Sequence, residues 1–158
     1  DEQGDRRRAN AAFLNEALDR IPGIRTQKVL FEKSRSSYHL YTIMYDENEY
    51  GVTKEAMVKA LNAEGIPVMA GYIVPLYKQP LFTEKAFGPY SGSLATDIDF
   101  GALNHPVCEK ACASEAMWLH QAVLLGSREQ MEAIVGAFEK LEANREELKE
   151  ISVEQVTA

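Results

Sequence analysis

The sequence has few cysteines, no long hydrophobic run and no excess of positive charge. No stretch reaches the ~18 apolar residues of a transmembrane helix. The opening DEQGDRRRAN has no apolar core of the kind that a signal peptide contains. The net charge of −7 argues against a surface for nucleic acid or anionic membrane, because such surfaces need clustered lysine and arginine. We therefore expect a cytoplasmic protein that binds neither nucleic acid nor membrane.

The two cysteines, Cys108 and Cys112, are too few for a disulfide framework. Their spacing places both on one face of a helix, but a zinc site needs about two more ligands. Of the three histidines only His105 is near them in sequence. We expect no metal site, and we interpret the cysteines as thiols packed in the protein interior.

Common catalytic motifs are also missing. The chain has no G-x-S-x-G elbow, no H-E-x-x-H and no glycine-rich phosphate loop. His39 and His120 lie in predicted strands, where a histidine most often has a hydrogen-bonded structural role. The residues by themselves therefore predict no catalytic group.

What the sequence does contain is the pattern of a small sheet with helices. Helices are predicted at 5–20, 54–64, 106–114 and 127–148, and strands near 29–31 and at 37–45, 66–72 and 116–121. The strand at 37–45 is apolar on both faces, which favours an internal position, and an exposed turn follows it at 46–49. Thr53 and the Ser127-x-x-Gln130 capping box mark two helix starts. Strand, helix and strand between 37 and 72 form a segment of βαβ size.

Residues 73–104 lack a regular pattern, and the stretch GYIVPLYKQPLF at 71–82 contains their most informative part. Pro75 and Pro80 exclude a long regular helix, and Pro75 would break a central strand. The aromatic and basic residues of the stretch are Tyr72, Tyr77, Lys78 and Phe82. Two interpretations remain open: a surface loop anchored by its own aromatics, or one wall of a ligand pocket, where exposed aromatics beside a lysine are more usual.

Five segments in order resemble the C-terminal part of the sugar aminotransferases of DegT and StrS type, which depend on pyridoxal phosphate. They are FLNEALDRIPGI after Arg8-Ala9-Asn10-Ala11, YHLYTIMY, ALNAEGIPV, GYIVPLYKQPLF, and HPVCEKACASEAMWLHQAVLLGSREQMEAIVGAFEKL. The resemblance covers roughly residues 6–142. It implies an α+β fold with a small, mostly antiparallel sheet flanked by helices, like the C-terminal domain of fold-type I pyridoxal-phosphate-dependent transferases. It also implies an interdomain-type helix at 1–23, a small domain at 24–148 and a frayed tail at 149–158.

In that family the loop that residues 71–82 resemble borders the sugar pocket, and it is often written His-Tyr-x-Pro-Leu-His-x-Gln-Pro-x-Tyr. Gly71 and Tyr77 stand where the commoner pattern has histidine, so the substrate preference does not carry over. Tyr77 is still expected to donate a hydrogen bond to a sugar hydroxyl. The resemblance implies that Tyr72, Tyr77, Lys78 and Phe82 contact the substrate.

The same resemblance implies a cofactor that this chain alone is not expected to bind. The family's Schiff-base lysine, and the acid that pairs with the pyridine nitrogen, lie in a large domain that precedes the matched segments. None of the nine lysines here has a matching context. We expect the C-terminal fragment of an enzyme, inactive by itself, whose intact homodimer transfers an amino group from glutamate or glutamine to a keto sugar or keto cyclitol. The alternative is a stand-alone α/β module that binds a small molecule or regulates, without catalysis.

Overall fold

The computed structural model describes residues 1–29, 34–91 and 97–150. The chain divides into two compact units. The sheet unit comprises residues 1–71 and 114–158, and the inserted unit comprises residues 72–113. The division expected at residues 23 and 148 stays a prediction, and most of the expected tail, residues 151–158, lies outside the described residues.

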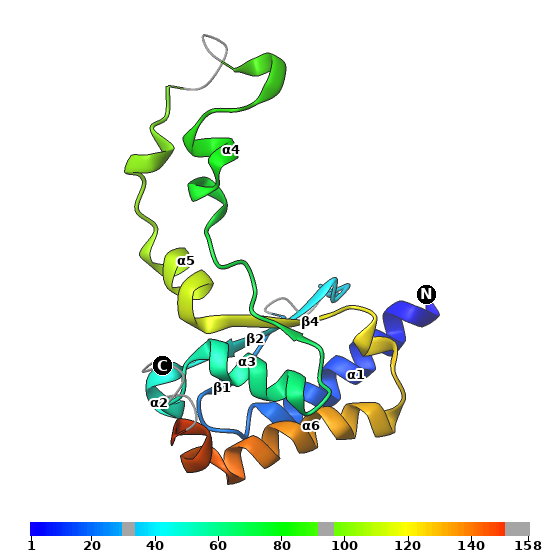
Figure 1. The fold of residues 1–158 in the computed structure, drawn as a ribbon. Coiled ribbons are helices and arrows are strands. Elements are labelled where there is room, and N and C mark those ends of the chain that lie inside the picture. The colour runs from blue at the N-terminus through cyan, green and yellow to red at the C-terminus, as the bar shows by residue number, and fades with distance from the viewer. Residues whose placement is uncertain (30–33, 92–96, 151–158) are drawn as a thin grey trace. The chain divides into compact units, whose positions relative to one another are not determined.

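The sheet unit places its strands on a layer of helices (Figure 1). Its helices are α1 (Glu2–Leu18), α2 (Glu47–Tyr50), α3 (Lys54–Ala63), the 3₁₀ turn η6 (Val123–Leu125) and α6 (Arg128–Ala143). Its strands are β1 (Ile24–Thr26), β2 (Leu40–Tyr45), β3 (Val68–Met69) and β4 (Ala116–His120). The Thr53 hydroxyl accepts from the backbone N–H of Ala56, and the Ser127–Gln130 capping box is formed, so both predicted helix starts are confirmed.

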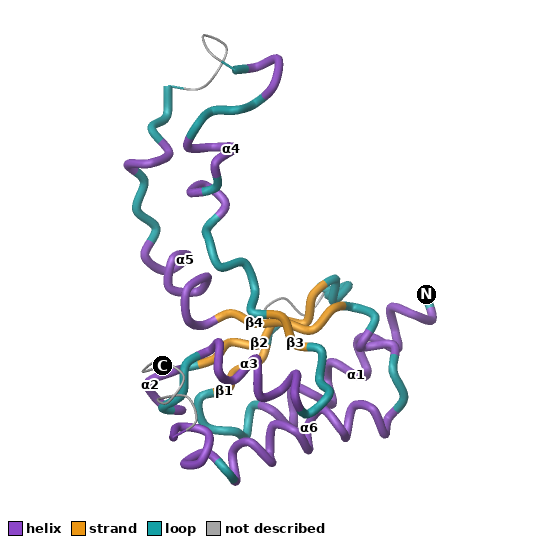
Figure 2. The backbone as a smooth tube through the Cα atoms, viewed as in Figure 1, coloured by secondary structure: helices purple, strands orange, loops and turns teal. Residues whose placement is uncertain are grey.

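The four strands lie in the order β1-β2-β4-β3, and every neighbouring pair is antiparallel. Figure 2 marks these strands in orange. Because β2 and β3 are both antiparallel to β4, they run in the same direction as each other. The strand–helix–strand segment therefore has the directions of a βαβ unit, but β4 lies between its two strands. The predicted α+β fold with a small antiparallel sheet is confirmed.

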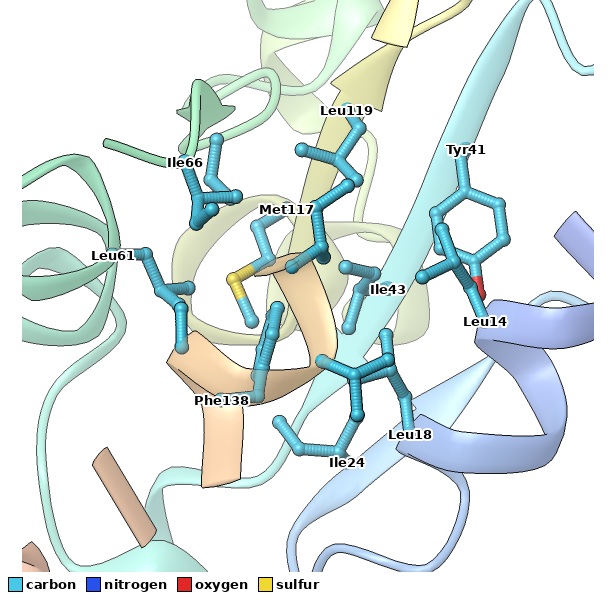
Figure 3. Packing of buried hydrophobic residues seen from close by; sticks show 14 of the residues in the cluster. Leu14, Leu18, Ile24, Tyr41, Ile43, Leu61, Ile66, Met117, Leu119 and Phe138 are labelled. Atoms are coloured by element: carbon cyan, nitrogen blue, oxygen red, sulfur yellow. The ribbon is translucent and has the colours of Figure 1, made fainter. Parts of the chain in front are cut away.

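The hydrophobic core fills the space between one sheet face and helices α1, α3 and α6 (Figure 3). Alternation along β2 directs Tyr41, Ile43 and Tyr45 into this core. The hydroxyl of Tyr41 donates to Asn15 Oδ1 at 2.7 Å and that of Tyr45 donates to the Val52 carbonyl at 2.8 Å. These hydrogen bonds satisfy the polar ends of two buried side chains, so the core tolerates them.

Several local predictions differ from the structure. The strand predicted at 37–45 is formed only at Leu40–Tyr45, and the helix predicted at 106–114 is α-helical only at Pro106–Lys110. The first strand is Ile24–Thr26, held by the Asp19 carboxylate that accepts from the N–H of Thr26 at 2.7 Å; of the predicted 29–31, residue 29 is not in a strand and 30–31 lie outside the described residues. The turn predicted at 46–49 is the one-turn helix α2, capped by the Asp46 carboxylate. The strand predicted at 66–72 is formed only at Val68–Met69.

In the inserted unit the described residues, 72–91 and 97–113, form no strand and only short helical segments. They are the 3₁₀ turns η1 (Leu76–Lys78), η2 (Gly88–Tyr90) and η4 (Phe100–Ala102), and the helices α4 (Pro80–Thr83) and α5 (Pro106–Lys110). A π-helical turn, η5 (Ala111–Glu115), follows α5 and leads to β4. Proline occupies the first turn of both α4 and α5, where its missing N–H has no cost. Across the described parts of both units, no helix is long and apolar enough to cross a membrane.

Candidate functional site

Two short helical segments of the inserted unit bring four polar side chains together. The N–H of Lys78 donates to the Pro75 carbonyl at 3.0 Å, which closes η1 and places Tyr77 beside Lys78. His105 precedes Pro106 and caps α5, and the N–H of Glu109 donates back to the His105 carbonyl at 2.9 Å. The proline-started turns therefore fix both backbones from which the cluster projects.

The cluster is centred on the carboxylate of Glu109. One of its oxygens, Oε1, accepts from the Tyr77 hydroxyl and, at 3.1 Å, from the backbone N–H of His105. The other oxygen lies 3.1 Å from the Lys78 ammonium. The His105 N–H is also 3.3 Å from the Tyr77 oxygen, and the two rings meet edge to face at 4.9 Å. A single carboxylate thus binds an aromatic hydroxyl and an ammonium side by side.

The electrostatics of the cluster agree with this geometry. Hydrogen bonds from the Tyr77 hydroxyl, from Lys78 and from the His105 N–H lower the pKa of Glu109 to about 2. Desolvation, then the neighbouring carboxylate, raises the pKa of Tyr77, and the hydrogen bond to the same carboxylate raises the pKa of Lys78. At neutral pH the cluster is therefore a carboxylate, a neutral phenol and an ammonium. Such a set can bind hydroxyl or carbonyl oxygens, but it offers no amine nucleophile at neutral pH.

The structure brings together only two of the four predicted substrate residues. Tyr77 and Lys78 share Glu109, whereas Phe82 packs in an aromatic cluster with Phe87 and Phe100, at ring distances of 5.8 and 5.3 Å. Tyr72 is 67% exposed. The substrate roles of all four stay predictions.

Glu109 and His105 were not identified from the sequence. Glu109 lies 32 residues from Tyr77, and no periodic pattern links positions so far apart. One local signal was present: Pro106 indicates a helix start, which places His105 at the cap and Glu109 one turn further on. That signal gives the position of Glu109 but does not show its partners.

Two further features outside this cluster are a groove and the cysteines. A groove of about 490 Å³ lies between α3 and residues 140–148, and its lining includes three alanines of α3 and the Lys140–Glu64 ion pair (2.7 Å). Cys108 is exposed at the surface of α5, so the predicted burial of this thiol is wrong. Where the structure describes the chain, no group of three or more His, Cys, Asp or Glu residues is arranged to hold a metal ion.

Comparison with known sequences gives a consistent set of relatives. The model of the DegT/DnrJ/EryC1/StrS aminotransferase family matches residues 1–137. L-glutamine:2-deoxy-scyllo-inosose aminotransferase of Micromonospora echinospora is 32% identical over 152 residues, which are 94% of this chain and 35% of that protein. The Streptomyces paromomycinus protein of the same name is 34% identical over 145 residues, which are 89% of this chain and 34% of that protein. The chain thus spans about a third of the length of these curated relatives.

Solved structures give the same result for the fold. 3-Amino-5-hydroxybenzoic acid synthase matches 91% of this chain and 35% of its own with a TM-score of 0.68 at 24% identity. A DegT/DnrJ/EryC1/StrS aminotransferase from Brucella abortus matches 87% of this chain and 31% of its own with a TM-score of 0.58 at 23% identity. At these identities the likeness shows a shared fold, which is the one that the resemblance implied.

Proposed function

Because this chain belongs to the DegT/DnrJ/EryC1/StrS aminotransferase family, we propose that it is the C-terminal part of a pyridoxal-phosphate-dependent enzyme. The intact enzyme would transfer an amino group from L-glutamine to a keto cyclitol, or to a keto sugar of similar size. The observation that carries this proposal is the identity of 32–34% to two L-glutamine:2-deoxy-scyllo-inosose aminotransferases over 89–94% of the chain.

The cluster around Glu109 supports a polyhydroxylated acceptor. Tyr77 and Lys78 offer polar atoms next to an aromatic face, and this combination suits a ring that has hydroxyl groups at its edge and C–H groups on its faces. In this proposal the inserted unit contacts the substrate through Tyr77 and Lys78, with Tyr72 and Phe82 nearby. Its contribution is to hold and orient the acceptor rather than to transfer a proton.

Lys78, the lysine of the candidate site, does not fit the role of a Schiff-base lysine in a pyridoxal phosphate site. A Schiff-base lysine needs an amine that loses its proton readily, whereas Lys78 is bound to a carboxylate that raises its pKa. We therefore propose that the cofactor is held by the large domain of the intact enzyme and that this chain alone does not bind it. The isolated chain, treated with pyridoxal phosphate and borohydride, should show no stoichiometric labelling of one lysine by mass spectrometry.

The proposed partners are the large domain and a second copy of the enzyme. Family membership supports a homodimer, and the two cysteines, which form no disulfide, are in keeping with a reducing, cytoplasmic compartment.

The proposal is tested by expressing the polypeptide that contains this chain together with its large domain. Purified enzyme should convert 2-deoxy-scyllo-inosose to an amine with L-glutamine as donor, whereas the isolated chain should not. Absence of transamination with every keto cyclitol and keto sugar tried, in an enzyme that has its lysine, would refute the activity. A polypeptide without a usable lysine would favour the alternative of a binding module.

The role of Tyr77 is tested in the same enzyme by separating the two half-reactions. Tyr77→Ala should slow the reaction with the keto substrate at least about 10-fold, the size expected for loss of a hydrogen bond to a charged or polar partner. The half-reaction with glutamine should change much less. Tyr90→Ala, which removes an exposed tyrosine of the same unit, is the control. Equal losses in both half-reactions would contradict a substrate contact.

A further inference from the structure

The carboxylate of Glu109 determines where the only hydroxyl proton of Tyr77 lies. A carboxylate whose pKa is about 2 can only accept hydrogen bonds at neutral pH. The proton between Tyr77 and Glu109 therefore belongs to the phenol and is directed at Oε1. Toward any other neighbour the Tyr77 oxygen can offer only a lone pair, so it acts as a hydrogen-bond acceptor. The backbone N–H of His105 already approaches this oxygen as a donor at 3.3 Å.

The second oxygen of Glu109 binds the ammonium of Lys78, which acts as a hydrogen-bond donor. It accepts one N–H of the ammonium at 3.1 Å. An ammonium group carries three N–H donors and no acceptor atom. Lys78 is 40% exposed along its side chain and Glu109 is 30% exposed, so the ion pair is accessible to a ligand. The pair of side chains bound to Glu109 therefore presents one acceptor, on Tyr77, and N–H donors, on Lys78.

We propose that Glu109 is a positioning residue that sets this polarity, so that a substrate hydroxyl must donate to Tyr77 while a second substrate oxygen accepts from Lys78. This inference rests on the proposed function and adds to it the direction of each hydrogen bond. It also replaces the expectation that Tyr77 donates to the sugar. The ligand class it defines is a ring with two oxygen substituents, of which at least one is a free hydroxyl.

Glu109 is not the only link between the two halves of the inserted unit. The ring of Phe82, which follows η1, packs at 5.3 Å on the ring of Phe100 in η4. Phe87 adds a third ring 6.3 Å from Phe100. These apolar contacts do not involve the carboxylate, so a change at Glu109 should leave the unit folded.

The first test is Glu109→Gln in the intact enzyme. The amide is similar in shape but carries no charge, so it no longer holds the Lys78 ammonium or dictates the direction of the Tyr77 hydroxyl. KM for the keto substrate should rise about 10-fold or more, kcat should change less, and the half-reaction with glutamine should stay within about twofold. Glu109→Asp, which keeps the charge, should recover part of the loss. Glu84→Gln, an exposed glutamate of the same unit, should behave like the wild type.

The second test measures the direction of the Tyr77 hydrogen bond itself. Single fluoro-for-hydroxyl analogues of 2-deoxy-scyllo-inosose keep a weak acceptor but lose the donor. One analogue should therefore show a KM about 10-fold or more above that of the parent with the wild-type enzyme. Tyr77→Phe should show no such penalty for the same analogue. This variant keeps the ring, so it serves even if Glu109→Gln fails to fold.

The outcomes separate the two proposals. If the wild-type enzyme aminates the keto cyclitol but Glu109→Gln leaves KM unchanged, or lowers both half-reactions equally, the positioning role is wrong and the proposed function stands. If every fluoro analogue is accepted as well as the parent, Tyr77 does not act as an acceptor, and the polarity proposal fails. If the wild-type enzyme aminates no keto substrate, both proposals fail together.

Discussion

The two units of this chain place their hydrophobic side chains in opposite ways. Every residue of the hydrophobic core belongs to the sheet unit, and the described residues of the inserted unit include only one buried residue, Pro75. Conversely, over the described ranges ten large hydrophobic side chains are exposed, and eight of them lie in the inserted unit. They are Tyr72, Ile73, Val74, Leu76, Leu81, Tyr90, Ile98 and Val107.

This contrast shows that the two units obtain their order from different sources. The sheet unit is stabilised by burial against its own helices, which is the usual source of stability for a domain. The inserted unit is held by short proline-started turns, a three-ring aromatic cluster and the carboxylate of Glu109. Exposed apolar area of this extent is typical of a surface that meets another protein or a ligand, which agrees with its proposed place at a substrate pocket.

The largest expected difference between the units concerns their phenylalanines. Phe138→Ala removes a side chain that is 1% exposed in the core, and it should lower the free energy of unfolding by about 3–5 kcal/mol. Phe82→Ala removes a half-exposed ring from the aromatic cluster, and it should cost about 1 kcal/mol or less in global unfolding. Urea denaturation of both variants measures this, and similar losses would show that the units unfold as one.

The second comparison uses two glycines with positive φ. Gly71, at φ +81°, has no room for a Cβ atom, which would lie 2.6 Å from the Ala116 carbonyl oxygen. Gly88, at φ +62° in the inserted unit, has no atom of the described residues within 4 Å of that position, apart from its two chain neighbours. Both alanine variants carry backbone strain of about 1 kcal/mol. Gly71→Ala should lower the free energy of unfolding by about 1–2 kcal/mol more than Gly88→Ala, because β3 must move away from β4. Equal midpoints in urea would contradict the close approach.

The third comparison concerns helix caps. Ser127→Ala removes the capping box of α6, and it should lower the stability of the sheet unit by about 1 kcal/mol. Asp99→Ala removes the carboxylate that caps the short η4 turn. Its effect should be confined to faster amide hydrogen exchange near residues 100–102, with an unchanged global midpoint. A global loss from Asp99→Ala would mean that the inserted unit contributes to the folding of the sheet unit.

The smallest expected effect is that the inserted unit loses the stabilisation provided by the Glu109 carboxylate at low pH. The folded-state pKa of Glu109, about 2, lies below its usual value of 4.5, so the stabilisation is complete above about pH 4.5 and is lost as the pH falls towards 2. The ¹³C shift of the Glu109 carboxyl should therefore stay constant from pH 8 to 5 and titrate near pH 2. In Tyr77→Phe the same carboxyl should titrate at a higher pH. A midpoint near 4.5 in the wild type would refute the cluster geometry.

The sequence predicted those parts of the fold that depend on neighbouring residues. The strand predicted at 37–45, the capping box at Ser127 and the helix after Thr53 all carry local signals. The strand is formed at Leu40–Tyr45, and the capping box and the helix are present. The position of β4 between β2 and β3 has no local signal, since strand order depends on packing across the whole sheet.

The candidate site divides in the same way. Tyr77 and Lys78 were predicted as site residues because they lie in one unusual stretch of sequence, and that role stays a prediction. Glu109 was not, because a carboxylate on a short helix is common and its contact spans 32 residues.

The pairing of β3 with β4 has a consequence for how this protein can change. Val68 lies opposite Leu119 and Met69 opposite Trp118, so residues 70–115, which include the inserted unit, are in topological terms the connection of a single hairpin. The entropy of closing such a connection changes by only about 0.6 kcal/mol for each doubling of its length. This connection can therefore be lengthened, shortened or exchanged while β3 and β4 keep their register. A change of ligand specificity then requires no change in the sheet.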